Sequence, residues 1–519
     1  WISYFSRKEP AYEFLKIDYG ERYPHLEEKR TFLLDLLNFH LSQFGDEPIL
    51  IIRAPGRLNL MGRHIDHQGG RVNVMCIDRE IFLTASLRTD SQIIGFDYEQ
   101  EKYKNVQFDF DLYTPQLELE WDELMENSEL LDALRGAPGD WENYFRAVVF
   151  KALTQYPNHS FLGLNICDRG NIPIGAGLSS SSALVVALAR AFLTLNELPY
   201  ADKELVQFTS EAEWFVGTRG GASDQAAIVF GTKGTVVQLH FFELNLGQRC
   251  ALPPGCEFLI CTSGITADKS GKQKDQFNEK ILAYEVGFEL LKQALPAHVE
   301  PLNHLRDIKP ANLKMEEAEI LQLLKELPEK LEFSQIPEQL GNPWEKLSKK
   351  FAFSRNPRHI PIRKVVAYGL SECERSATFM ECLSSSDLPT IGRYFNISHD
   401  GDRVMKYRFE TELQDQESSQ LFDNEISDSY LEAAIEQGTP IRALSGGYGC
   451  SIPEIDFIVD CANHLGALGG QICGGGLGGA AMILCKEIQC SQIVENLPHN
   501  YEKQFEKSCS VFAVHPVNG

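Results

Sequence analysis

The segment whose residue types point most clearly to a chemical function is 173–183, Pro-Ile-Gly-Ala-Gly-Leu-Ser-Ser-Ser-Ser-Ala. Its glycines allow the backbone to approach a ligand closely, and its hydroxyl side chains can supply oxygens to phosphate or Mg²⁺. A strongly apolar helical segment follows at 184–195, and its N-terminal N–H groups would point at an anion. No Gly-Lys-Ser/Thr follows as in a Walker A loop. The segment predicts a phosphate-binding loop; a Gly/Ser loop that only caps a buried helix is the alternative.

Residues 54–70 form a second candidate site, because they place two Arg, two His, one Asp and four Gly in a short stretch after a predicted strand. Asp and His side chains can exchange hydrogen bonds with adjacent hydroxyls, and glycines bring the backbone close. This combination is typical of a sugar site. The alternative is a polar turn in which Asp66 and Asn59 make local bonds.

Two further segments add a carboxylate and a glycine cluster. Residues 211–227 offer Glu211 and Glu213 near a helix end, followed by a glycine turn that presents Asp224. A carboxylate beside a hydroxyl can act as a general base, although an Asp after glycines also serves as a helix N-cap. Residues 469–479 contain seven glycines in eleven positions. Close approach to a ligand or to another loop explains that density better than a simple turn does.

The composition excludes several classes of partner. The formal net charge is −24, which argues against a large surface for nucleic acid or anionic membranes. The 13 cysteines include no CxxC pair, so zinc ribbons and thioredoxin-like chemistry lack support and a reduced, cytoplasmic chain is expected. No apolar run reaches about 18 residues, the length of a membrane span. The first residues do not resemble a signal peptide, and an additional upstream module is left open.

Hydrophobic periodicity predicts the elements that must position these segments. Charged helical sequence becomes prominent after residue 266, and we expect a domain boundary near 245. The predicted helices cover residues 25–45, 141–153, 201–216, 273–293, 314–327, 362–383, 424–437 and 455–463. The predicted strands cover residues 49–53, two pieces within 72–87 around Asp78 and Arg79, 161–166, 234–242, 257–262 and 480–485.

Taken in order, these segments resemble the GHMP kinase superfamily, and its galactokinase branch most closely. The family's sugar-binding signature, Gly-Arg-x-Asn-Leu-x-Gly-Glu-His-x-Asp-Tyr-x-Gly-Gly, is similar to residues 56–70, with Arg63 for Glu and His67 for Tyr. Its phosphate motif, Pro-x-Gly-x-Gly-Leu-Ser-Ser-Ser-Ala, is similar to residues 173–182, with Ser182 for the final Ala. Its Gly-Ile-Met-Asp-Gln segment is similar to residues 221–225, and its third, Gly-rich motif to residues 473–479.

The resemblance implies ATP-dependent phosphorylation of a sugar at its anomeric hydroxyl. Asp224 would accept or polarise the attacking hydroxyl, and Arg57 would stabilise the alkoxide and the transferring phosphoryl group. Ser181 and Glu213 would hold Mg²⁺, with Glu211 as the alternative carboxylate. The sugar-binding residues implied are Arg63, His64, Asp66 and Gly221. The ATP-binding residues implied are Pro173, Gly175, Ala176, Gly177, Leu178, Ser179, Ser180, Ser181, Ser182, Gly475 and Gly476.

Arg63 is the departure with the largest consequence for the substrate. The family's Glu at this position is associated with the C6 hydroxyl of the sugar, whereas an Arg would suit a carboxylate or phosphate there. Galacturonokinase, a relative in the same branch, has a segment similar to residues 64–70 and an Arg comparable to Arg219. A hexuronic acid is therefore a hypothesis beside galactose. The alternative is that Arg63 points away and pairs with a surface acid.

The resemblance also implies an α+β fold of two domains. Residues 1–245 would form an N-terminal, S5-domain-2-like α/β domain, and residues 246–519 a C-terminal, ferredoxin-like α+β domain. Simple galactokinases are shorter, so the acidic stretch 98–132 and residues 310–350 are expected to be insertions. Two other functions remain open: a sugar sensor without catalysis, and a GHMP kinase for another small alcohol such as mevalonate or homoserine. The predicted partners are a small-molecule sugar and ATP, and the sequence leaves the oligomeric state open.

Overall fold

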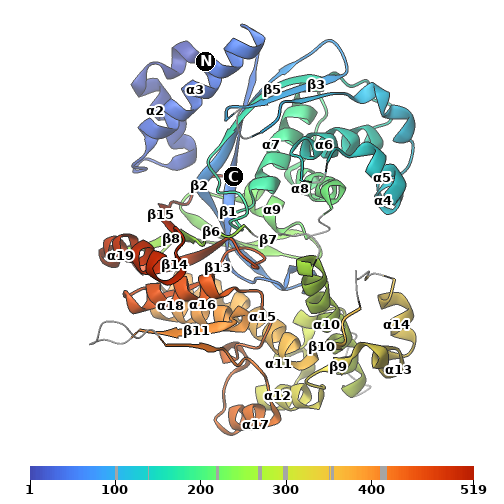
Figure 1. The fold of residues 1–519 in the computed structure, drawn as a ribbon, viewed down its shortest axis with the longest axis vertical. Coiled ribbons are helices and arrows are strands. Elements are labelled where there is room, and N and C mark those ends of the chain that lie inside the picture. The colour runs from blue at the N-terminus through green and yellow to red at the C-terminus, as the bar shows by residue number, and fades with distance from the viewer. Residues whose placement is uncertain are drawn as a thin grey trace.

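The structure, a computed structural model, describes residues 1–99, 103–137, 139–217, 221–266, 272–295, 302–349, 351, 356–409 and 418–519 (Figure 1). Arg219, one residue of the uronate hypothesis, lies outside these ranges. Among the described helices, none is long and apolar enough to cross a membrane.

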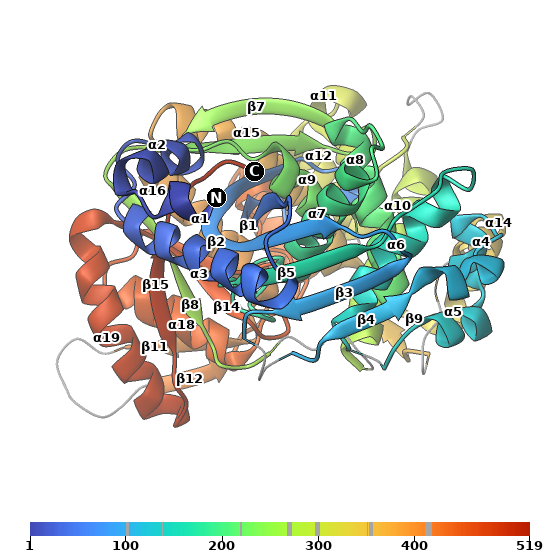
Figure 2. The same cartoon turned by 90° about the horizontal axis from the view of Figure 1, so that it is seen from above.

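A mixed sheet organises the N-terminal half of the described chain. Its strand order is β4-β3-β5-β2-β6-β7, with β1 paired to β2 and only β3 and β5 parallel. Helices cover both faces: α2 and α3 lie on one side, and α7, α8 and α9 on the other (Figure 2). The elements are α1 (Ile2–Phe5), α2 (Lys8–Tyr19), α3 (Leu26–Phe44), β1 (Leu50–Met61), β2 (Val72–Leu87), β3 (Gln92–Asp97), β4 (Val106–Asp109), α4 (Trp121–Glu126), α5 (Ser128–Leu134), α6 (Glu142–Gln155), β5 (Leu164–Gly170), α7 (Ser180–Leu195), α8 (Asp202–Ala212), α9 (Ser223–Phe230), β6 (Thr235–His240) and β7 (Asn245–Ala251).

An antiparallel sheet with the order β13-β14-β8-β15 organises the C-terminal half. Helices α16 and α18 pack on β13, and α10 packs on the long helix α15. The elements are β8 (Cys256–Thr262), α10 (Lys272–Ala294), α11 (Pro310–Leu313), α12 (Glu317–Glu326), β9 (Leu331–Glu332), α13 (Ile336–Leu340), α14 (Asn342–Leu347), β10 (His359–Ile360), α15 (Ile362–Ser384), α16 (Leu388–Asp402), β11 (Met405–Arg408), β12 (Ser418–Leu421), α17 (Asp428–Glu436), α18 (Pro453–His464), β13 (Gly469–Ile472), β14 (Ala480–Lys486), α19 (Glu487–Phe505) and β15 (Ser510–Val514).

Helix α7 occupies the centre of the N-terminal core. Its sequence from Ala183 to Leu193 is apolar on nearly every side, as expected for a helix that is buried all round. It packs on β1 and β2 from the sheet and on α6, α8 and α9 from the outer layer. This burial fixes the N-terminus of α7, and therefore the loop that precedes it.

The α+β fold is confirmed, and most predicted helices and strands are present. The interpretation of residues 72–87 as two strand pieces is wrong, because β2 runs unbroken through Asp78 and Glu80. Both charged side chains are buried and satisfied: Asp78 accepts hydrogen bonds from Tyr23 and His515, and Glu80 accepts them from Lys29 and other donors. Partners from other elements therefore allow charges within a continuous strand.

The acidic stretch 98–132 is more than a solvated excursion. Its charged side chains are largely exposed, but Trp121, Leu124 and Leu131 are buried in the N-terminal core. The first sheet ends after the predicted domain boundary at 245, because β7 belongs to it and spans Asn245–Ala251, and β8 of the second sheet begins at Cys256. The exact division stays a prediction.

Asp78 ties three distant parts of the chain together. Tyr23, just before α3, donates to its Oδ2 at 2.8 Å, and His515, after β15, lies 3.0 Å from the same oxygen through Nδ1. Burial raises the pKa of Asp78, but the hydrogen bond from His515 and the charge of Lys29 outweigh it and lower this pKa to about 2. The folded protein therefore stabilises the ionised form of the Asp78 carboxyl group.

We expect Asp78→Asn to destabilise the protein by roughly 2 kcal/mol at pH 7, since its pKa lies nearly two units below the usual value. A depressed carboxyl pKa contributes stability above the unfolded pKa of about 4, and this stability is lost as the pH falls towards 2. Denaturant unfolding at several pH values should therefore show the difference between wild type and variant shrinking below about pH 4. Asp46→Asn, at an exposed position, is the matched control. A deficit that stays constant down to pH 3 would contradict the linkage.

Candidate active site

Arg57, Asp224 and Ser179 meet where three elements converge. Arg57 lies on β1, Asp224 in the first turn of α9, and Ser179 is the N-cap of α7. Arg57 donates to Asp224 Oδ1 from Nε at 2.9 Å and from Nη2 at 2.7 Å, and Ser179 Oγ donates to Oδ2 at 2.6 Å. The Arg57 side chain is 7% exposed and that of Asp224 is 30% exposed. A buried cation thus orients a carboxylate that a substrate can still reach.

The two glycine-rich loops pack backbone against backbone beside this group. A Cβ on Gly177 would lie 2.3 Å from the carbonyl oxygen of Cys473, and the φ of Gly177 is +75°, so only glycine fits. Gly475 has no atom within 4 Å of its Cβ position and leaves that face open. Because α7 begins here, its free N–H groups and positive dipole end favour an anion. The geometry therefore fits a phosphate-binding cradle made from both loops.

This juxtaposition brings the two sets of predicted ATP-binding residues side by side. The loop before α7 and the start of that helix carry Pro173, Gly175, Ala176, Gly177, Leu178, Ser179, Ser180, Ser181 and Ser182, and the second loop carries Gly475 and Gly476.

Glu213 faces the first turn of α7. Ser182 Oγ donates to both of its carboxylate oxygens, at 3.2 and 3.0 Å, and Gln225 Nε2 also donates to it. The hydroxyl of Ser181, which the resemblance pairs with Glu213, interacts with Tyr144. Glu211 lies elsewhere, in an ion pair with Lys151 at 2.6 Å. Of the two carboxylates considered, Glu213 is the one near the phosphate loop.

Asp66 lies against the glycine turn that precedes α9. Ser223 Oγ donates to its Oδ2 at 3.1 Å, and His67 Nδ1 lies 3.2 Å from its Oδ1. A Cβ on Gly221 would come within 2.4 Å of Oδ2, so any larger residue here would displace the Asp66 carboxylate. Burial raises the pKa of Asp66, but the contacts with His67 and Ser223 outweigh it and lower this pKa to about 2. Asp66 is therefore an ionised acceptor in contact with Ser223, the first residue of the helix that carries Asp224.

Arg63 has its partners within the protein. Its side chain is 1% exposed; Nη2 donates to Asp402 Oδ2 at 2.9 Å and to Ser398 Oγ at 3.0 Å, and Nη1 donates to the carbonyl of Ile472 at 3.0 Å. The sequence left open that Arg63 pairs with an acid on the surface. Its partner is indeed an acid of the protein, but a buried one, because Asp402 is 0% exposed. The guanidinium is already neutralised, and the uronate hypothesis loses its main support.

His64 lies in a buried aromatic cluster next to this ion pair. Its ring stacks on Tyr448 at a centroid distance of 4.1 Å and an interplanar angle of 12°, and Tyr368 lies 6.0 Å away. Its Nε2 lies 3.5 Å from Asp402 Oδ1. Burial raises the pKa of Asp402, but the interaction with His64 and the charge of Arg63 outweigh it and lower this pKa.

Asp402 and Tyr448 are residues of the site that the sequence did not indicate. Asp402 ends α16, and Tyr448 lies in an irregular segment after α17. Neither belongs to a recognisable motif, and only the tertiary arrangement brings them to His64. The one feature that could have indicated Asp402 was Arg63 itself, because a buried arginine needs an acidic partner somewhere in the chain.

Three family descriptions match the sequence. They are the galactokinase galactose-binding signature over residues 38–87, the N-terminal domain of GHMP kinases over residues 143–232, and the C-terminal region of GHMP kinases over residues 429–503. The first covers Arg57, His64 and Asp66, and the second covers the phosphate loop and Asp224.

Known galactokinases are similar along nearly the whole chain. The galactokinase of Roseiflexus sp. is 25% identical over 482 residues, covering 92% of this chain and 94% of that protein. The galactokinase of Dictyostelium discoideum is 25% identical over 496 residues, covering 92% and 90% respectively. The fold is similar to that of Lactococcus lactis galactokinase complexed with galactose, with a TM-score of 0.65 at 19% identity over 94% of this chain and 98% of that one.

In chain order, the three matched segments contain Arg57, the phosphate loop and the second glycine loop. The structure brings these three parts together in one site. The chain therefore belongs to the GHMP kinase superfamily and is galactokinase-like.

Proposed function

We propose that this protein is an ATP-dependent sugar kinase that phosphorylates the anomeric hydroxyl of galactose or a closely related neutral hexose. The observation that carries the proposal is the contact of Arg57 and Ser179 with the Asp224 carboxylate at the edge of the two glycine loops. This contact joins a proton acceptor, a fixed positive charge and an anion cradle in one place. The galactose-binding signature supports a sugar as the acceptor.

In the proposed reaction the anomeric oxygen attacks the γ-phosphorus of ATP. Asp224 accepts the proton of this hydroxyl as the new O–P bond forms, the bond from the γ-phosphorus to the bridging oxygen breaks, and ADP leaves. Arg57 stabilises the charge that develops on the attacking oxygen and on the phosphoryl group. The first turn of α7 binds phosphate oxygens through backbone N–H groups. Asp66 and His64 bind other hydroxyls of the sugar.

Mg²⁺ fits the residues near the phosphate loop, because Glu213 supplies a carboxylate there and serines supply hydroxyls. Glu213 with Ser181 or Ser182 would hold the ion, which when bound neutralises phosphate charge. Ser181 stays a predicted ligand, and the Ser182 contact with Glu213 makes Ser182 a second candidate.

A neutral sugar is favoured over a sugar acid by the charges near His64. A uronate would need an unpaired cation at this end of the site, whereas Arg63 is paired with Asp402. The same proposal includes a cytoplasmic location, as expected from the reduced cysteines.

The proposal is tested by a coupled ADP-release assay with a panel of galactose, galacturonate, glucose, mevalonate and homoserine. We expect turnover with galactose and a product that carries phosphate on C1, identified by ³¹P NMR. A preference for galacturonate would refute the choice of a neutral sugar. Galactose binding without any turnover would refute the kinase proposal and support a sensor.

Glu213 and Glu211 form a matched pair for testing the metal site. We expect Glu213→Gln to raise the Mg²⁺ concentration for half-maximal activity at least about tenfold, because a neutral amide binds Mg²⁺ more weakly than a carboxylate. Glu211→Gln should leave this concentration unchanged, since Glu211 pairs with Lys151. Titrating Mg²⁺ at saturating ATP measures the difference. Equal effects of the two variants would contradict the assignment of Glu213.

A further inference from the structure

Asp402 contacts two consecutive residues of the sugar-binding segment from the other half of the chain. Its Oδ2 accepts from Arg63 Nη2 at 2.9 Å, and its Oδ1 lies 3.5 Å from His64 Nε2. The backbone N–H of Cys450 also donates to Oδ1, at 3.4 Å. One carboxylate thus neutralises the buried Arg63 and faces a single nitrogen of the His64 ring.

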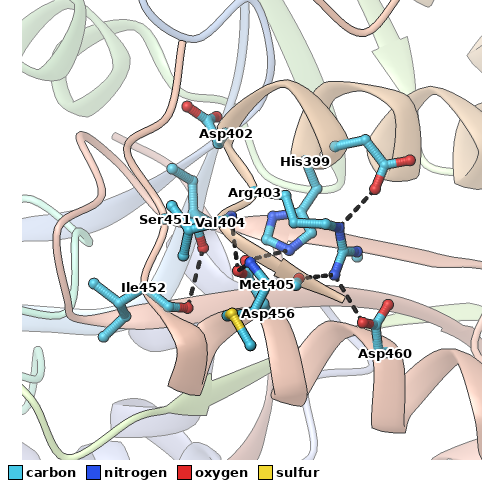
Figure 3. A network of polar contacts seen from close by, with 12 residues as sticks. His399, Asp402, Arg403, Val404, Met405, Ser451, Ile452, Asp456 and Asp460 are labelled. Carbon is cyan, nitrogen blue, oxygen red and sulfur yellow. Dashed lines mark hydrogen bonds and ion pairs between the residues drawn. The ribbon is translucent and has the colours of Figure 1, made fainter. Parts of the chain in front are cut away.

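A buried polar network fixes the end of α16 that carries Asp402 (Figure 3). Ser451 N donates to the Asp402 carbonyl at 2.9 Å, and Arg403 donates to Asp400 and Asp460 at 2.7 Å each. This network anchors the chain on both sides of Asp402, because Val404 and Met405 also donate their N–H groups to Asp456 of α18, at 2.9 and 2.7 Å. His399 Nε2 lies 3.2 Å from Asp456 Oδ1 on the preceding turn. The position of the Asp402 carboxylate is therefore set independently of His64.

The His64 ring has little freedom to choose another orientation. It is stacked on Tyr448, its side chain is 3% exposed, and its backbone has a φ of +60°, which is rare for a residue other than glycine. Nε2 is buried and makes no hydrogen bond among the described residues, and the acceptor it approaches is Asp402 Oδ1, at 3.5 Å. A carboxylate at this place favours a proton on Nε2, and the neutral ring then keeps its lone pair on Nδ1. Nδ1 is then an acceptor for a hydroxyl group.

A metal ion is a poorer explanation of this cluster. Single ligand atoms of His64, Asp402 and Cys450 lie within 4.8 Å of one another, which would suit a cation by distance. However, the Arg63 guanidinium already occupies Asp402 with a fixed positive charge. Burial also raises the pKa of the Cys450 thiol, and a protonated thiol is a weak ligand.

We propose that Asp402 is a positioning residue, which holds His64 as the Nε2–H tautomer so that Nδ1 accepts a hydrogen bond from a hydroxyl of the sugar. This inference rests on the proposed function, because it assigns a task to His64 in binding the same substrate. Asp402 itself does not touch the sugar.

Kinetics give the first test. We expect Asp402→Asn to raise the KM for galactose about tenfold or more, the effect of losing one oriented hydrogen bond, and to leave the KM for ATP unchanged. Ser398→Ala is the matched control: it removes a neutral hydroxyl that contacts the same Arg63 nitrogen from the same helix but keeps the Asp402 carboxylate beside His64, and the KM for galactose should stay unchanged. A folded Asp402→Asn variant with wild-type KM for galactose overturns the inference.

A double-mutant cycle separates positioning from a general structural role. His64→Phe keeps a ring that can stack on Tyr448 but removes both nitrogens. If Asp402 acts through His64, Asp402→Asn should change the KM for galactose less than about twofold on this background. Equal effects with and without His64 would overturn the inference. If Asp402→Asn does not fold, the double variant Arg63→Met/Asp402→Asn takes its place, because it removes both charges of the ion pair. The same results are expected of it.

The tautomer can be measured without activity. Long-range ¹⁵N–¹H spectra of the free protein, with the His64 signal assigned by its loss in His64→Phe, should show the Nε2–H form in wild type and a loss of that preference in Asp402→Asn. An Nδ1–H tautomer in the wild type overturns the inference. Absence of turnover with every sugar refutes the proposed function instead, and the tautomer together with calorimetric galactose binding then decides the role of Asp402.

Discussion

Asp224→Asn is expected to lower kcat by about 10³–10⁴-fold, the largest effect of any single change considered. Asn has the same size as Asp; its Oδ1 can still accept from Arg57, and its Nδ2 can donate to Ser179 Oγ once that hydroxyl turns, so the local contacts persist. It cannot accept the proton of the attacking hydroxyl. The variant should therefore fold and bind ATP and galactose with nearly wild-type affinity, while the chemical step fails.

The comparison needs a control of the same kind and a readout for each step. Asp202→Asn changes an exposed carboxylate that also lies in the first turn of a helix, α8, and should leave kcat unchanged. Single-turnover measurement of ADP release reports the chemical step, and calorimetry reports binding. Retained turnover in a folded Asp224→Asn protein would show that another group accepts the proton.

The sequence was most informative where function depends on short segments. The glycines and serines of residues 173–182 predicted the phosphate cradle, because close backbone approach and a following apolar helix are local properties. The structure adds the reason for the second glycine cluster: Gly474 and Gly479 approach the first loop itself, at Gly177 and at Gly175 and Ala176. Sequence periodicity alone does not reveal which loop faces which.

The sequence was least informative for α16 and α19, which were not predicted. Helix α16 has a proline in its first turn and two further glycines, and α19 contains Pro498. These residues weaken local helix signals, yet Pro is tolerated in a first turn and tertiary packing stabilises the remainder. Missing α16 also meant missing Asp402, since the partner of a buried charge follows from packing between distant segments and not from spacing.

The interpretation of Arg63 illustrates the same limit for specificity. Its residue type alone allowed either a substrate carboxylate or a protein carboxylate as partner. The end of α16 supplies Asp402 at 2.9 Å, in a site from which water is excluded. A second negative charge from a uronate would face an ion pair that is already balanced, and its desolvation would lack a compensating cation.

Arg63→Met is expected to destabilise the protein by about 3–5 kcal/mol, because it leaves the buried Asp402 without its counter-charge. Met retains much of the volume of the side chain, so the loss reports the ion pair rather than a large cavity. Arg88→Met is the matched control: Arg88 also pairs with a carboxylate, Asp90, but the two side chains are 22% and 45% exposed, and the expected change is under about 1 kcal/mol. Denaturant unfolding of the three proteins measures these differences.

The same variant separates the two interpretations of Arg63 in catalysis. If the guanidinium serves only Asp402, Arg63→Met lowers turnover of galactose and galacturonate by the same factor, and the ratio of their kcat/KM values stays constant. If Arg63 binds a substrate carboxylate, galacturonate alone loses about tenfold or more, the effect of one charge-assisted contact, and unfolding changes little. We expect the first result, because Nη1 and Nη2 of Arg63 already donate to protein groups, the Asp402 carboxylate among them, and the side chain is 1% exposed. Substrate selection would then depend on hydrogen bonds that sugar hydroxyl groups donate to His64 and Asp66, and not on a charge at this position.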